Sequence, residues 1–378
     1  MIDILTKSEY DPLPMLRRVN NPRNPYLSES REWLEPPPAA ELEVYEESAK
    51  SILSENDSPD IPFRWSLNPY RGCQHACAYC YARTTHEYLG MGAGTDFDTR
   101  LVAKINAPDL LRAAFSKRGW SRESICFSGV TDCYQPIEAV YRLTRRCLEV
   151  CLEFRNPVSI VTKGCLVLRD LELLVELQRQ AGARLYQSVA FADDRMARLI
   201  EPQAPPPSKR FEVMARLREA GIPVGVMVAP IIPGLNDTQV PQILEAAARS
   251  GAASAAYTSL RLARNVAPVF LDRIRESLPQ RADRIESRIR EMRSGQLNDP
   301  AFGDRMSGRG VYWESIERLF RVSAEKYGLA LPGDRPKQAQ TKSRGSGNEP
   351  GRRGRPRRSR GNDRSLPLFP DHLGPPPS

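Results

Sequence analysis

The chain has 378 residues, of which 40% are hydrophobic and 27% are charged, so it is long enough to bury a sizeable core. The most apolar run, at 223–234, is too short and too often interrupted to cross a bilayer, and residues 1–60 lack the pattern of a secretory signal. Eight cysteines in such a chain do not indicate a disulfide framework. We therefore expect a cytoplasmic protein with no membrane contact.

The formal charge of +9 is concentrated at one end of the chain. Residues 334–378 contain eleven Lys or Arg and four Asp or Glu, a net charge of +7, which leaves +2 for residues 1–333. The same segment is rich in Gly, Pro, Ser and Gln and has one aromatic residue. We expect it to be a disordered basic tail.

Residues 1–60 are rich in Pro, Glu and Ser and predict an N-terminal extension that packs on the body. Within it, the stretch EPPPAAELEVYEESAKSIL predicts a loop followed by a short amphipathic helix.

From residue 61 onward, short β-branched runs alternate with longer segments of helical period. A first strand is expected just before Cys73, and five more are expected at 124–128, 157–163, 184–190, 223–230 and 253–260. The helices between them are expected at 136–154, 168–181, 208–220 and 238–250, with Ser208 as an N-cap and Gly221 as a stop. This alternation predicts an α/β protein with a parallel sheet, either closed as a barrel or open, with its site in the loops after the strands.

Three cysteines, Cys73, Cys77 and Cys80, lie within eight positions, and the next cysteine is Cys126. A structural zinc site would need a fourth ligand, which His75 or His86 would supply. Alternatively, three thiolates hold three irons of a [4Fe-4S] cluster and leave the fourth iron open for another ligand. In the second case the missing cysteine is itself the functional feature.

The spacing Cys-x3-Cys-x2-Cys, with Tyr79 before the last cysteine, resembles the signature of radical S-adenosylmethionine (SAM) enzymes. A longer set of motifs is similar to the spore photoproduct lyase-like, or DNA repair photolyase-like, subgroup: NPYRGCQHACAYCYAR, TDCYQPIE, VTKGCLVLRDLELL, IEPQAPPPSKRFE, PIIPGLND and RMSGRGVYWESIERLF. The resemblance implies a partial (β/α)6 TIM-like barrel. We accordingly expect an N-terminal extension at 1–60, a core barrel at 61–290, a helical segment at 291–333 and the tail at 334–378.

The resemblance also implies site residues. Cys73, Cys77 and Cys80 would ligate a [4Fe-4S] cluster, whose open iron binds SAM. The side chains expected to contact SAM follow the strands or the cysteines; they are Tyr79, Ser128, Thr131, Asp132, Lys163 and Ser188. For two of them a structural role stays open, since Lys163 could be a solvated strand-end lysine and Asp132 a capping carboxylate.

One position departs from the family pattern. The photoproduct lyases carry a hydrogen-donor cysteine after the second strand, where this chain has Gly129. Cys133, four residues later, is the alternative donor, or else a small apolar thiol. Tyr81 resembles a radical-relay tyrosine of the lyases, or it serves packing alone.

The resemblance implies an enzyme that cleaves SAM reductively and acts on nucleic acid, with a one-electron donor of flavodoxin or ferredoxin type. Two alternatives remain: a radical enzyme that modifies RNA or a protein side chain, and a metal-bearing DNA-binding protein without catalysis. In the tail, GRRGRPRRSRG (351–361) is similar to an AT-hook. SLPLF (365–369) is similar to peptides that dock on the DNA sliding clamp. Both features favour DNA or another nucleic acid as a partner, and a solubilising role of the tail stays open.

Overall fold

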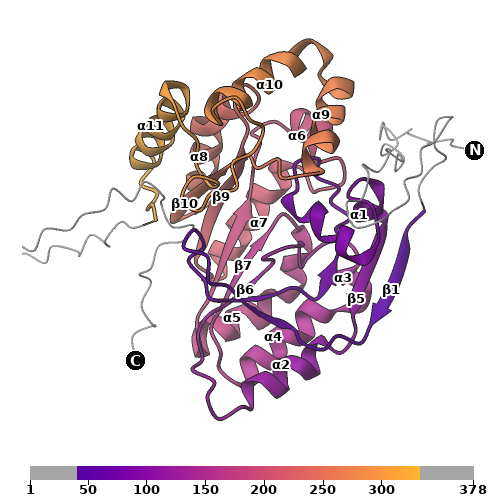
Figure 1. The fold of residues 1–378 in the computed structure, drawn as a ribbon. Helices are drawn as coiled ribbons and strands as arrows, with labels where there is room; N and C mark the ends of the chain where they lie inside the picture. The colour runs from indigo at the N-terminus through magenta and orange to yellow at the C-terminus, as the bar shows by residue number, and fades with distance from the viewer. Residues whose placement is uncertain (1–40, 333–378) are drawn as a thin grey trace, which may run out of the picture.

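Six parallel strands form the centre of the computed structural model, which describes residues 41–332 (Figure 1). They are β3 (Trp65–Leu67), β6 (Ile125–Phe127), β7 (Val158–Thr162), β8 (Ala183–Ser188), β9 (Val224–Ile231) and β10 (Ser254–Ser259). Their order across the sheet follows the sequence from β3 to β10, and β2 (Leu53–Glu55) adds an antiparallel strand beside β3. All six strands predicted from the sequence are confirmed.

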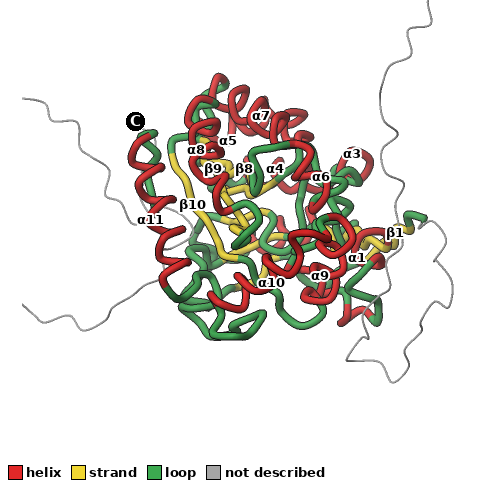
Figure 2. Tube along the Cα trace, turned by 90° about the horizontal axis from the view of Figure 1, so that it is seen from above, coloured by secondary structure: helices red, strands yellow, loops and turns green. Residues whose placement is uncertain are grey.

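Helices connect these strands and cover the outer face of the sheet, as Figure 2 shows from above. They are α2 (Ala107–Phe115), α4 (Leu143–Glu153), α5 (Leu171–Gln180), α7 (Pro207–Glu219) and α8 (Val240–Arg249). A curved parallel sheet with helices on its outer side is the partial (β/α)6 barrel that the motifs implied.

Two details of the helix prediction differ. The helix expected at 136–154 is broken at Arg142, which has a φ of 53°, into α3 (Glu138–Tyr141) and α4. The expected N-cap Ser208 is wrong, because Pro206 is the N-cap of α7 and the Ser208 hydroxyl bonds Asp194 instead. Gly221, with a φ of 83°, does follow the end of α7, as predicted.

The remaining helices are α1 (Thr95–Thr99), α6 (Asp194–Ile200), α9 (Val266–Ser277), α10 (Pro279–Met292) and α11 (Val311–Lys326). Four short 3-10 turns occupy Tyr81–Thr85, Glu87–Leu89, Cys165–Asp170 and Asp237–Gln239. Among residues 41–332 there is no helix with the length and apolar character that crossing a bilayer requires.

A second, three-stranded sheet lies beside the barrel. It consists of β1 (Glu43–Glu47), β5 (Arg100–Lys104) and β4 (Tyr70–Arg71), with β1 parallel to β5. The amphipathic helix expected in this part of the extension is therefore wrong, because five of its residues form an extended strand. Pairing with β5, more than fifty residues away in sequence, overrides the local helical pattern.

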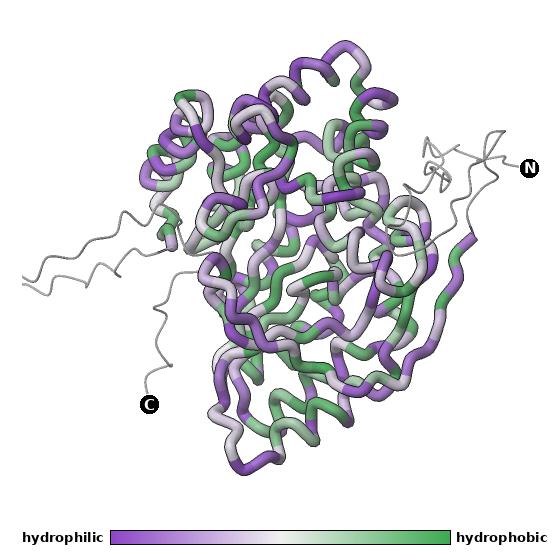
Figure 3. Tube along the Cα trace, viewed as in Figure 1, coloured by the Kyte–Doolittle hydropathy of each residue, from purple (hydrophilic) through white to green (hydrophobic). Residues whose placement is uncertain are grey.

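The main core lies between the sheet and the outer helices. Ile160, Leu185 and Val226 from the strands belong to one buried cluster with Leu217 and Leu244 from the helices, and each of these side chains is at most 1% exposed. Figure 3 shows the hydrophobic residues concentrated along the central strands. Burial of each such side chain stabilises the fold by about 1.5–3 kcal/mol.

The barrel is incomplete, and two loops close its gap. The backbone N–H of Gly303 donates to Asp60 Oδ1 at 2.7 Å, and Arg305 Nε donates to Asp60 Oδ2 at 2.5 Å. The loop that carries Asp60 also inserts Phe63 against Tyr186 inside the barrel. The ends of the open sheet are thereby joined around a small interior.

Candidate functional site

The cysteine loop begins at a position that requires glycine. Gly72 has a φ of +74°, and a Cβ there would lie 2.9 Å from the carbonyl oxygen of Phe97. This close approach lets the backbone N–H of Cys73 donate to the same oxygen at 2.9 Å. Further along the loop, the N–H of Ala78 donates to the carbonyl of Ile200 at 2.9 Å. The loop is therefore fixed at both ends to other segments.

A cavity of about 270 Å³ opens where the parallel strands end, and the cysteine loop forms one of its walls. Ten of the eleven predicted site residues line it: Cys73, Cys77, Tyr79, Cys80, Tyr81, Ser128, Thr131, Asp132, Lys163 and Ser188. These residues come from the loops after β3, β6 and β7 and from the end of β8. The structure thus brings together residues that span 116 positions of sequence.

Burial sets the chemistry of the three thiols. It raises the pKa of Cys77 to about 12, the pKa of Cys73 well above its usual value, and the pKa of Cys80 in the same direction. Lys163 and Arg210 oppose this shift at Cys77 because their positive charges favour the thiolate. A bound metal would supply the positive charge that three buried thiolates need.

The zinc interpretation meets two obstacles. Within 41–332, no three His, Cys, Asp or Glu side chains are gathered closely enough to hold one metal ion. Both candidate histidines also have other partners, since His75 Nδ1 faces Asp132 at 3.3 Å and His86 Nε2 contacts the Arg100 carbonyl at 2.7 Å. A cubane cluster, by contrast, spreads its three thiolates over three irons.

Asp132 links the cysteine loop to β7. Its carboxylate accepts hydrogen bonds from the Thr162 hydroxyl at 2.6 Å and from the Lys163 backbone N–H at 2.7 Å, and it faces His75. Burial would raise its pKa, but His75, the Thr162 hydroxyl and the Lys163 N–H lower the pKa well below the usual range. The acid is ionised, and both of its oxygens already have partners.

Ser128 and Thr131 are positioned by the loop after β6. The Thr131 hydroxyl donates to the Tyr70 carbonyl at 3.0 Å, so its lone pairs remain able to accept a hydrogen bond from an ammonium group. Ser128 Oγ accepts from the Cys133 N–H at 2.8 Å and also interacts with the Cys133 side chain. Asn68, just after β3, supports the loop by accepting from the Val130 N–H at 2.8 Å.

Tyr79 belongs to a buried polar network. Its hydroxyl donates to Glu201, which is also paired with Arg210, and both charged side chains are fully buried. Arg210 further donates to the carbonyls of Pro205 at 2.6 Å and of Ser188 at 3.0 Å. Burial raises the pKa of Glu201, but the charges of Arg210 and Lys163 lower it more, so the carboxylate is ionised.

Lys163 and Ser188 end neighbouring strands. The Lys163 ammonium lies over the Tyr79 ring, 5.6 Å from its centroid. Burial lowers its pKa, but the net shift is upward because Cys77 and Glu201 favour the charged form. Ser188 Oγ lies 3.5 Å from the Ala229 carbonyl, at the edge of hydrogen-bond distance. Both side chains are placed to contact a ligand in the cavity.

Tyr81 extends from the loop toward the end of β6. Its hydroxyl donates to the Gly129 carbonyl at 2.5 Å. A Cβ on Gly129 would lie 3.0 Å from Ser66 Cβ, so a cysteine at this position would require Ser66 to move. The position is therefore tight for any side chain larger than hydrogen.

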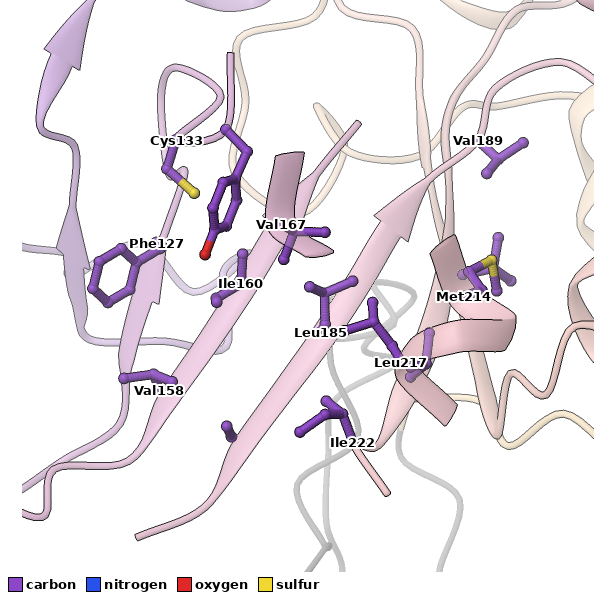
Figure 4. Close-up of a cluster of buried hydrophobic side chains, with 14 of the residues drawn as sticks. Phe127, Cys133, Val158, Ile160, Val167, Leu185, Val189, Met214, Leu217 and Ile222 are labelled. Carbon is purple, nitrogen blue, oxygen red and sulfur yellow. The ribbon is translucent and has the colours of Figure 1, made fainter. Parts of the chain in front are cut away.

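Cys133 is the predicted site residue that the structure does not bring to the cavity. It is 0% exposed, and Figure 4 shows it in a cluster of hydrophobic side chains with Phe127 and Ile160. A direct hydrogen transfer from this thiol would need the loop to rearrange. Cys126, one residue before Phe127, does line the cavity.

Glu201, Asn68 and Arg210 are functional residues that the sequence motifs did not identify. Each acts through a partner far away along the chain, such as Tyr79, which is 122 residues from Glu201. The one available signal was the acidic and basic pair in IEPQAPPPSKRFE. Its spacing does not reveal that both charges are buried.

Comparisons with known proteins agree with this geometry. Residues 67–247 match the model of the Radical SAM superfamily. An uncharacterised protein of Mycobacterium tuberculosis is 35% identical over 272 residues, which cover 71% of this chain and 79% of that protein. The Radical SAM Nalpha-GlyT isomerase of Pseudomonas phage M6 is 23% identical over 271 residues, covering 70% and 54%.

Among solved structures, the fold is similar to spore photoproduct lyase complexed with dinucleoside spore photoproduct. The TM-score is 0.55 at 15% identity, and the match covers 76% of this chain and 80% of that one. The superfamily match spans β3 to α8 and includes the cysteine loop. The chain therefore belongs to the radical SAM superfamily of enzymes.

Proposed function

We propose that Cys73, Cys77 and Cys80 hold a [4Fe-4S] cluster and that SAM binds beside it in the same cavity. The observation that carries this proposal is that all three thiols line one cavity together with the polar strand-end side chains. When bound, the cluster and SAM supply a 5′-deoxyadenosyl radical that abstracts hydrogen from a substrate. The protein's contribution is to bind, orient and exclude water.

The side chains around the cavity have distinct roles in this proposal. Lys163 pairs with the carboxylate of SAM, because it is the cation at the end of β7. Thr131 accepts a hydrogen bond from the SAM ammonium, and Ser128 and Ser188 add further polar contacts. Asp132 holds the Lys163 backbone and His75 in place and does not itself need to touch SAM.

Tyr79 is the proposed neighbour of the adenosyl group. Its hydroxyl is fixed by Glu201, so its ring offers a rigid apolar face with Lys163 on one side. Tyr81, held by Gly129 at the cavity wall, is a candidate for radical relay. We leave Cys133 out of this set, because its thiol is buried in the core.

A nucleic acid is the proposed substrate. The structural relative is complexed with a dinucleoside spore photoproduct, and the cavity of this chain carries the aromatic side chains Phe63 and Tyr81, which suit base stacking. The basic tail would add attraction to phosphates. The AT-hook-like segment and the clamp-like segment 365–369 lie outside the described residues, as does the whole tail. A one-electron donor of flavodoxin or ferredoxin type is also required.

Anaerobic reconstitution with iron and sulfide tests the proposal. We expect wild-type protein to bind about four irons, show the spectrum of a [4Fe-4S] cluster and release 5′-deoxyadenosine from SAM with dithionite. Cys77→Ala removes one thiolate and should abolish both the spectrum and the release. Cys133→Ala, a matched loss of a buried thiol outside the cavity, should keep both.

Substrate class is tested separately with the reconstituted enzyme. Deuterium in 5′-deoxyadenosine after incubation with deuterated DNA, but not with deuterated RNA or protein, would support a DNA substrate. Deuterium transferred to 5′-deoxyadenosine from RNA or from protein would instead support the alternative that the enzyme modifies RNA or a protein side chain. Stoichiometric zinc with no SAM cleavage would contradict the proposed cofactors.

A further inference from the structure

Arg261 follows β10 and lines the same cavity as the cysteine thiols. No carboxylate within residues 41–332 pairs with its guanidinium, and its Nε is buried there without a hydrogen-bond acceptor. One terminal nitrogen lies 3.9 Å from the Met306 sulfur, which is a weak acceptor. Its other close neighbour is the Tyr81 ring, 6.0 Å away at the centroid. In the described part of the chain, the group is thus a cation at the cavity wall without a strong partner.

Asp60 is the carboxylate whose charge favours the protonated form of Arg261, and Asp60 is itself engaged by Arg305 at 2.5 Å. Burial and the charge of Arg305 together lower the pKa of Arg261. A partly buried cation without a carboxylate partner costs stability, and an anionic ligand at the cavity wall would offset that cost.

The backbone that carries Arg261 is held firmly. Arg293 donates to Ser259 Oγ at 2.6 Å and to the Leu260 carbonyl at 3.0 Å. The Ser259 N–H donates to the Met306 carbonyl at 3.1 Å. The guanidinium is therefore presented from a rigid strand end, which lowers the ordering cost of binding a ligand.

We infer that Arg261 binds a phosphodiester of the substrate at the end of β10. This inference rests on the proposed function. It names the part of the nucleic acid that contacts the cavity wall. The planar guanidinium matches two phosphate oxygens, whereas the neighbouring Tyr81 and Phe63 offer faces for a base. Arg261 is distinct from Lys163, which is assigned to the SAM carboxylate.

The experiment uses the full-length reconstituted enzyme and two probes: thymidylyl-thymidine and its analogue with a neutral methylphosphonate link. A single phosphate minimises the contribution of the basic tail. We expect Arg261→Gln to weaken binding of the charged dinucleotide about tenfold or more. Binding of the neutral analogue and SAM cleavage without substrate should not change, and Arg261→Lys should retain part of the affinity.

Arg118→Gln is the matched control, because it removes an exposed arginine that precedes β6, at the opposite ends of the strands. Since Arg261 has no ion-pair partner among residues 41–332, Arg261→Gln should melt at or above the wild-type temperature, which separates a binding defect from misfolding. Equal dinucleotide affinity in wild type and Arg261→Gln would overturn the inference but leave the radical chemistry intact.

Two further outcomes separate this inference from the proposed function. If wild-type enzyme binds inorganic phosphate through Arg261 but not the dinucleotide, the anion subsite stands and the nucleic-acid substrate is wrong. If Arg261→Gln loses affinity for SAM and not for the dinucleotide, Arg261 serves the cofactor and the inference is wrong.

Discussion

Glu201 and Arg210 form a fully buried ion pair that holds the Tyr79 hydroxyl. Such a pair contributes little net stability compared with apolar residues, but the loss of one member leaves the other charge uncompensated. The pair holds the side chain of Tyr79, which lies between Cys77 and Cys80 in the sequence. Its role is therefore to position that side chain. This interpretation predicts different effects of single and double substitution.

We expect Glu201→Gln to lower the free energy of unfolding by on the order of 3–5 kcal/mol, because Arg210 then remains charged in a dry environment. The double variant Glu201→Gln with Arg210→Met should recover a large part of that loss. Urea unfolding of the three proteins measures both effects. A single variant as stable as the wild type would show that the pair is solvated and not buried.

Among single residues, those whose chemistry is visible in their own motif could be predicted from the sequence. The three cysteines, Lys163 and Ser188 follow strands that the hydrophobic pattern predicts, and parallel strands bring their ends together. Glu201 could not be found in this way, because its role depends on an interaction across 122 residues. Arg261 was equally invisible, since its significance comes from the absence of a carboxylate beside it in the described structure.

Among the elements, the segment after the cysteines supports the loop from behind. His86 is fully buried, and its Nε2 lies 2.7 Å from the Arg100 carbonyl, so this nitrogen carries the proton. Its Nδ1 has no hydrogen-bond partner among the described residues. Its ring packs edge-on against the ring of Phe97, and the carbonyl of Phe97 accepts the hydrogen bond from the Cys73 N–H. A neutral imidazole is therefore built into the support of the cysteine loop.

This arrangement predicts a pH dependence of stability. Burial lowers the pKa of His86 below the value of about 6.5 in an unfolded chain, so below that pH the unfolded state binds a proton that the folded state does not. The free energy of unfolding should then fall as the pH decreases below about 6.5. His86→Gln should show a shallower fall between pH 7 and pH 5 in urea unfolding. The same slope in both proteins would contradict this role.

The elements also show where local pattern fails. Residues 43–47 place two adjacent apolar residues between glutamates and so lack the strict alternation of a strand, yet they form β1 because β5 provides a partner strand. The barrel strands were easier to predict, since most of them are rich in apolar or β-branched residues and are followed by helices of the expected length. A two-residue strand such as β4 has too few residues for any period to be recognised.

The whole molecule combines a nearly neutral body with a basic tail. The C-terminal end of the described body is tied down before residue 333: the Ala255 N–H donates to the Ala330 carbonyl at 2.9 Å, and α11 packs on α8. Residues 334–378, with a net charge of +7, follow these interactions. Folding and attraction to nucleic acid should therefore be separable by a truncation after Gly333.

We expect deletion of residues 334–378 to leave the melting temperature unchanged and to weaken binding of a duplex DNA. The dependence of log affinity on log salt should become shallower by about 0.9 for each phosphate that the tail neutralises in the full-length protein. A full-length variant in which the arginines of segment 351–361 are replaced by glutamine separates charge from chain length. Fluorescence anisotropy across a salt series measures the slopes. An unchanged slope in the truncated protein would assign DNA attraction to the body, where Arg261 then becomes the first cation to test.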